Sequence, residues 1–156
     1  MVEPIPAIRR VLAVTDLSPF GNAAAAWAYA IAPSGSTVHL CHVFEVHPLP
    51  SPLYAHYSPG RHVSAEERRA AIERCRSDLA ALEPANARER GVRTSVEVVE
   101  AEDVSEAILR TAREVEADVL CLGTHGRTGL VGALPGSVAK AVLHHATRPV
   151  LLVPAR

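Results

Sequence analysis

Five short runs of apolar or alternating residues recur along the chain, and none is long enough for an amphipathic helix. Three of them, at residues 8–14, 118–122 and 149–153, end in short apolar runs, which are typical of strands that are covered on both faces, as in a parallel sheet. The third run alternates apolar and polar residues. The pattern predicts five strands, at residues 8–14, 37–43, 94–99, 118–122 and 149–153.

The segments between these runs carry helix signals. Ser18 can cap a helix that has Pro19 in its first position, where the missing N–H is harmless. Ser64 and Glu67 have the spacing of a capping box. Four helices are predicted: one through residues 19–30, one from Ser64 that Pro84 ends or kinks, one from Asp103 through Val115, and one from Ser137 to Ala146.

Strands and helices thus alternate from one end of the chain to the other. At 156 residues this predicts a single domain, 1–156, of the α/β class: a doubly wound, mostly parallel sheet with helices on both faces. In such folds, ligands bind beyond the carboxyl ends of the strands, where the strand order reverses. If the first strand is central and the fourth lies beside it, Asp16 and Gly123 face one crevice.

One stretch breaks the alternation. Residues 44 to 63, from Phe44 to Val63, contain four prolines and no hydrophobic period. Long loops inside compact domains are usually either binding lids or mobile segments. The sequence predicts a long loop here and leaves its role open.

Composition narrows the function. The net charge of −1 and the lack of a basic block argue against a protein that binds nucleic acid and favour one that binds a small ligand. No apolar run approaches the ~18 residues of a membrane span, and the start lacks a leader pattern, so we expect a cytoplasmic protein with no membrane contact. Three cysteines without CxxC spacing predict reduced structural thiols, and eight histidines without ligand spacing predict no metal site.

A glycine-rich stretch stands between the fourth predicted strand and the last predicted helix. Gly123 and Gly126 flank a turn suited to positive φ or to close approach of a ligand, and Gly136 offers the same freedom before the helix. The N–H groups of Ser137 and Val138 can then hold a phosphate, as helix N-termini do. Glycine turns are also common where nothing binds, and Ser137 would then be an N-cap.

Four further residues are candidates, each with an ordinary structural alternative. Asp16 directly follows a strand and can accept hydrogen bonds from ribose hydroxyls, or can simply cap the turn before Ser18. Val43 can form an apolar wall for a purine ring, or can simply pack. Lys140 and Arg127 can serve phosphate, or can be solvated surface cations.

The sequence offers no catalytic machinery that we can identify. It contains neither a G-x-S-x-G elbow nor a G-x-x-x-x-G-K-[ST] loop. Residues Ser137 to Lys140 match S-x-x-K, but no companion motif of the serine acyl-enzymes accompanies them. An obvious catalytic base is missing, so no catalytic residue is predicted.

The glycine spacing resembles the signature of the universal stress protein family, specifically its ATP-binding branch. That signature is G-x-x-G, nine residues, G-[ST], and it matches here at Gly123, Gly126, Gly136 and Ser137. Similar segments extend over essentially the whole chain: Val14-Thr15-Asp16, His42-Val43, Ala117 to Gly123, and Arg148 to Val153.

The resemblance implies a sheet of order 3-2-1-4-5, ATP with or without Mg²⁺ in the crevice, and a homodimer that pairs the last strands of two chains. By motif position, Asp16 would hold ribose, and Val14 and Val43 would flank adenine, with Thr15 in the same segment. Residues from Gly126 to Val138, Arg127 among them, would hold the phosphates.

Four features depart from the family pattern, and one of them is the long proline-containing loop of residues 44–63. Ala101-Glu102-Asp103 stands where the family often has a Gly-x-Pro-like turn, Lys140 stands where an acidic residue is frequent, and Pro135 precedes Gly136. The sequence therefore predicts an ATP-binding stress-response or regulatory protein with slow or no hydrolysis. The alternatives are a nucleotide hydrolase or phosphotransferase that uses Lys140 or Arg127, and a nucleotide-free interaction module.

Overall fold

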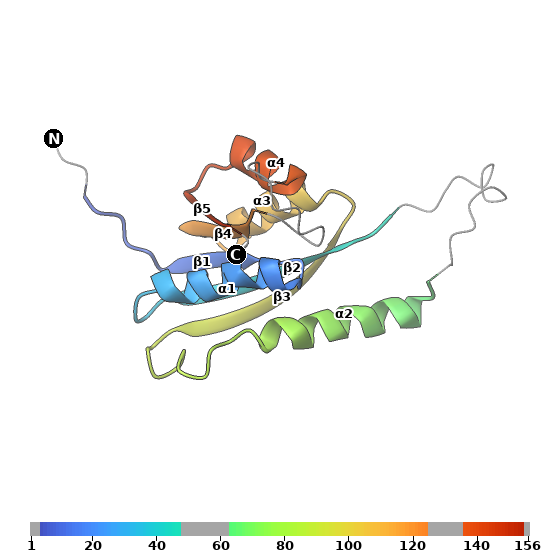
Figure 1. Cartoon of the computed structure of the whole chain (residues 1–156), viewed down its shortest axis with the longest axis horizontal. Coiled ribbons are helices and arrows are strands. Elements are labelled where there is room, and N and C mark those ends of the chain that lie inside the picture. Colours follow the sequence, from blue (N-terminus) through green and yellow to red (C-terminus); the bar gives the residue numbers. More distant parts are fainter. Residues whose placement is uncertain (1–3, 48–62, 125–135, 155–156) are drawn as a thin grey trace.

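A computed structural model describes residues 4–47, 63–124 and 136–154 of the chain (Figure 1). In the described residues, strands and helices alternate strictly. The elements in chain order are β1 Arg10–Val14, α1 Pro19–Ile31, β2 Thr37–Glu45, α2 Ala65–Ala80, β3 Arg93–Ala101, α3 Val104–Glu114, β4 Val119–Gly123, α4 Ser137–His145 and β5 Val150–Val153.

The five strands form one parallel sheet of order β3-β2-β1-β4-β5. The predicted α/β fold and strand order are confirmed. Strand β1 is central, and Val11 pairs with Val38 of β2 on one side and with Val119 of β4 on the other. The chain first adds strands on the β2 side and then crosses back to β4, so the order reverses between β1 and β4.

Helices cover both faces of the sheet, which explains why β1 and β4 are apolar on both sides. Alternate β1 residues serve the two faces: Val11 and Ala13 pack under α1 and α2, whereas Leu12 and Val14 pack under α3 and α4. In Figure 1, α4 lies at the top of the view and α2 at the bottom, with the strands between them. Among the helices that the structure describes, none combines the length and the apolar character of a membrane span.

The helix starts follow the local capping signals. The Ser18 hydroxyl accepts from the Gly21 N–H at 3.0 Å, with Pro19 in the first position of α1. Ser64 and Glu67 form the complete capping box of α2. Because these interactions are local, the sequence was sufficient to predict them.

Several boundaries differ from the prediction. Strands β2 and β3 continue to Glu45 and Ala101, because their backbones pair up to that register. Phe44 and Glu45 are therefore strand, not loop, and residues 48–62 of the predicted loop lie outside the described residues. Helix α2 ends at Ala80, four residues before Pro84, and only Leu79 is fully buried in it.

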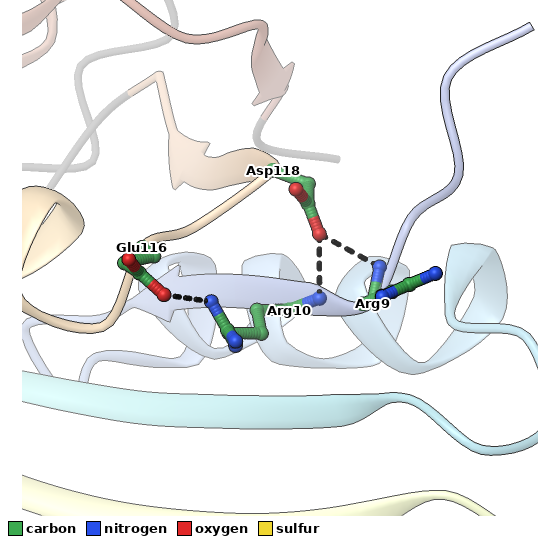
Figure 2. A network of polar contacts seen from close by, with 4 residues as sticks. All are labelled: Arg9, Arg10, Glu116 and Asp118. Atoms are coloured by element: carbon green, nitrogen blue, oxygen red, sulfur yellow. Dashed lines mark hydrogen bonds and ion pairs between the residues drawn. The ribbon is translucent and has the colours of Figure 1, made fainter.

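A carboxylate fixes the amino end of the sheet. Asp118 Oδ2 accepts from the backbone N–H groups of Arg9 (2.7 Å) and Arg10 (2.9 Å), while the Arg10 guanidinium pairs with Glu116 (Figure 2). Burial opposes ionisation of Asp118, but the two N–H bonds and the charges of Arg10 and Arg148 outweigh it and lower its pKa below the usual 3.8.

This lowered pKa predicts a pH-dependent contribution of Asp118 to stability. A carboxyl with a lower pKa in the folded chain stabilises the fold above its unfolded pKa, and this contribution is lost as the pH falls through the folded pKa. We expect Asp118→Asn to unfold at less urea than the wild type at pH 7, with the gap narrowing below pH 3.8. Asp78→Asn, on the exposed side of α2, is the control. A gap of equal size at pH 7 and pH 3 would contradict the assignment.

The cysteines differ in accessibility. Cys41 and Cys121 are buried in the sheet, and burial raises the pKa of each thiol to about 12, with the charge of Glu97 adding to the effect at Cys41. Cys75, on α2, is half-buried. Because the thiolate is the reactive form, we expect a thiol reagent at pH 7.5 to label one cysteine per native chain and three after unfolding. Rapid labelling of three in the native chain would contradict this.

Candidate functional site

A pocket of about 330 Å³ opens at the carboxyl ends of β1, β2 and β4. The first turns of α1, α3 and α4 complete its walls. The pocket lies where the strand order reverses, because the helices that follow β1 and β4, α1 and α4, leave the sheet on opposite faces and open a crevice between them.

The structure brings eight of the ten predicted site residues into this pocket: Val14, Thr15, Asp16, Val43, Gly123, Gly136, Ser137 and Val138. The other two, Gly126 and Arg127, lie outside the described residues. A ligand role for all ten stays a prediction. The pocket wall also contains residues to which the sequence had given no site role: Gly21, His42, Val104, Ile108, Leu122, Thr124 and Ala139.

Thr15 is bonded on every polar atom. Its N–H donates to the Cys41 carbonyl (3.0 Å), and its carbonyl faces His42 Nδ1 (2.9 Å). Its hydroxyl donates to Asn22 Oδ1 (2.8 Å) and accepts from the Leu17 N–H (2.9 Å). The Thr15 side chain is therefore built to hold the turn after β1, with its hydroxyl proton already committed.

Asp16 also shapes this turn. Its Oδ1 accepts from the N–H of Ser18 (3.0 Å) and from the Ser18 hydroxyl (2.5 Å), which is the capping role that the sequence had left open. A carboxylate has about four acceptor positions, so these bonds leave capacity for a ligand hydroxyl. Leu17, which stands between Asp16 and Ser18, has φ +64°, and this left-handed backbone conformation is strained for a residue with a side chain of its size.

Gly21, in the first turn of α1, lets this turn pack against the helix. A Cβ at Gly21 would lie 2.2 Å from Asp16 Oδ1 and 2.9 Å from Thr15 Oγ1, far inside contact distance. The requirement is steric and tertiary. The sequence shows only a glycine inside a helical pattern, so it could not reveal this role.

One half of the pocket is apolar. Val14 and Val43 lie at the ends of neighbouring strands, and Val104, Ile108 and Leu122 complete the lining. Most of these side chains also belong to the core beneath α3 and α4. A flat, weakly polar group fits such walls better than a charged one.

The other half is formed by the start of α4. The N-cap residue of α4 is Gly136. Because glycine has no side chain, no side chain caps the first-turn N–H groups of α4. The Gly136 N–H donates to the Thr124 carbonyl at 2.7 Å, which holds this helix end at the end of β4. Exposed N–H groups at a helix N-terminus attract anions.

The structure decides points in this region that the sequence had left open. Gly136 has φ −60°, so it does not need a left-handed conformation, and a Cβ there would meet the Thr124 carbonyl at an ordinary 3.5 Å. Ser137 is the first helical residue and not the N-cap. Lys140 is exposed and does not line the pocket. Among the described lining residues, Asp16 and His42 are the titratable ones.

Comparisons with known proteins agree with this arrangement. A profile of the Universal stress protein family matches residues 7–154. Universal stress protein MJ0531 of Methanocaldococcus jannaschii is 42% identical over 67 residues, which are 43% of this chain and 39% of that protein. The matched segment thus spans about two fifths of that relative.

Solved structures show the same fold. The hypothetical protein MJ0577 has a TM-score of 0.72 at 20% identity, with 96% of this chain and 97% of the other covered. A universal stress protein in complex with cAMP has a TM-score of 0.60 at 21% identity, covering 97% and 100%. A universal stress protein family protein from Arabidopsis thaliana with AMP bound has a TM-score of 0.59 at 18% identity, with 95% of this chain and 92% of the other covered. With the family profile matching nearly its whole length, the chain belongs to the universal stress protein family.

Proposed function

We propose that this chain binds an adenine nucleotide, ATP or a shorter relative, in the pocket at the ends of β1, β2 and β4. The observation that carries the proposal is the division of the pocket. Its apolar half suits a base, and its other half ends in helix N–H groups without a side-chain cap, which suit phosphate. Two proteins of the same fold hold AMP and cAMP.

In this proposal each part of the nucleotide has its residues. Adenine lies between Val14 and Val43, and the ribose hydroxyls donate to the Asp16 carboxylate. The phosphates accept from the N–H groups of Ser137 and Val138. Gly123 and Gly136 leave room for the backbone to approach the ligand, with Thr15 holding the turn. Gly126 and Arg127 are included on the family spacing alone.

We propose binding without efficient turnover. Asp16, the carboxylate of the described lining, already accepts two hydrogen bonds from Ser18, which leaves it poorly suited to activate a water. A Mg²⁺ ion would come with the phosphates of ATP, and phosphate or carboxylate oxygens are the ligands it prefers. The chain would act as a cytoplasmic stress-response or regulatory protein whose conformation depends on the nucleotide.

We also propose a homodimer through β5. Among the described strands, β5 pairs with β4 alone, and three of its four residues are half-buried apolar side chains. An apolar edge strand left unpaired invites association. Native mass spectrometry tests this directly, since it reports subunit number and copurified nucleotide together. A monomer at all concentrations would contradict the dimer.

A thermal-shift series with ATP, ADP and AMP tests the nucleotide proposal. A ligand that binds only the folded chain stabilises it by about 2.7 kcal/mol at a hundredfold excess over Kd, so a clear rise in Tm is expected. Asp16→Asn keeps an oxygen for Ser18 but removes the charge, and should reduce the shift. Asp118→Asn, at the opposite end of the sheet, should keep it. No nucleotide-dependent shift of the wild type would overturn the proposal.

A further inference from the structure

His42 connects β2 to the turn that follows β1. Its Nδ1 lies 2.9 Å from the carbonyl oxygen of Thr15, and its side chain is only 4% exposed. A carbonyl oxygen can only accept, so Nδ1 carries the hydrogen and the tautomer of the neutral ring is determined. The ring also lines the pocket. His42 therefore combines a fixed place in the wall with a bond to the turn.

That turn needs support from outside itself. Leu17 is held at φ +64°, and a strained residue of this kind persists only where surrounding contacts over-determine it. Thr15 and Asp16 supply local bonds, to the Leu17 N–H and to Ser18. Two bonds tie the turn to β2: the Thr15 N–H donates to the Cys41 carbonyl, and His42 Nδ1 donates to the Thr15 carbonyl. Of these two, only the His42 bond is made by a side chain.

We propose that His42 is a positioning residue for the nucleotide: its Nδ1–H bond to Thr15 keeps the turn in the conformation that presents Asp16 to the ligand. The inference rests on the proposed function, and it assigns to His42 a part in nucleotide affinity that acts through Asp16, beyond its place in the pocket wall. The simpler role is packing, in which the ring only fills the wall of the pocket.

Amide substitutions separate these two roles. The side-chain nitrogen of asparagine is attached to Cγ, like Nδ1 of histidine, so the amide introduced by His42→Asn can donate to the Thr15 carbonyl from a similar place. The glutamine nitrogen lies one bond further out and cannot take that place without displacing the turn. Glutamine, however, is closer to histidine in volume. A positioning role therefore predicts that His42→Asn keeps more of the nucleotide affinity than His42→Gln does. A packing role predicts the opposite order.

The experiment is calorimetric titration of the full chain with AMP at 10 °C, after circular dichroism has shown each variant to be folded. We expect His42→Asn to bind within about threefold of the wild type, and His42→Gln and His42→Ala to bind about tenfold more weakly. His39→Asn is the matched control, because His39 lies on the same strand, faces the opposite side and does not line the pocket. It should bind like the wild type.

A double variant tests whether His42 acts through Asp16. If it does, adding His42→Ala to Asp16→Ala should weaken AMP binding by less than about threefold, since residues that act through one another are not additive. Equal weakening by His42→Asn and His42→Ala, or the full tenfold effect in the Asp16→Ala background, would overturn the inference alone. A wild type that does not bind AMP, ADP or ATP would overturn the proposed function and this inference with it.

Discussion

Gly21→Ala is expected to lower the free energy of unfolding by about 2–3 kcal/mol and to weaken adenine nucleotide binding at least tenfold. The added Cβ would lie 2.2 Å from Asp16 Oδ1 and 3.1 Å from the Asp16 backbone nitrogen. The helix would have to move away from the turn, or Asp16 would have to leave its bond to Ser18. Urea unfolding and calorimetric titration measure the two effects.

The sign of this result is informative. Inside a helix, alanine is normally more stable than glycine by about 0.5–1 kcal/mol, so helix propensity alone predicts stabilisation. Gly136→Ala is the matched control for stability, because its Cβ would meet only the Thr124 carbonyl at 3.5 Å. It should change the free energy of unfolding by less than about 0.5 kcal/mol. A Gly21→Ala chain as stable as the wild type would contradict the close approach between Gly21 and Asp16.

Ile108→Ala is expected to cost about 2–4 kcal/mol of stability. Ile108 is 1% exposed, belongs to the core beneath α3 and α4, and also lines the pocket. Its removal leaves a cavity next to the proposed base site, so nucleotide binding should weaken several-fold as well. Leu109→Ala, on the same helix but only partly buried, is the control and should cost less. Equal losses from the two variants would contradict the assignment of Ile108 to both core and site.

The features that the sequence could predict are local ones. Apolar runs such as 118–122 identify buried strands wherever they occur, and caps such as Ser18 and Ser64 act within four residues. The sheet order came from the family resemblance, and the structure confirms it. The ends of β2 and β3 were missed because Glu45 and Ala101 are held in the sheet by backbone pairing, which leaves no signal in side-chain hydrophobicity.

The site residues that were missed act across the fold. Gly21 matters because of its distance to Asp16, and His42 because its ring reaches the carbonyl of Thr15. Neither contact has a signature in sequence spacing. Gly136 shows the reverse case. A glycine at this position allowed a positive φ, but its φ in the structure is −60°. The presence of a glycine in a sequence does not show whether the position needs a positive φ or needs space for a neighbouring group.

The central claim is that the pocket between β1 and β4 holds an adenine nucleotide. The most direct measurement is calorimetric titration of ATP and AMP into the nucleotide-free wild-type chain. We expect saturable binding of one nucleotide per chain, weakened by Asp16→Asn and unchanged by Asp118→Asn. Heats no larger than those of dilution, at nucleotide concentrations up to about 1 mM, would contradict it.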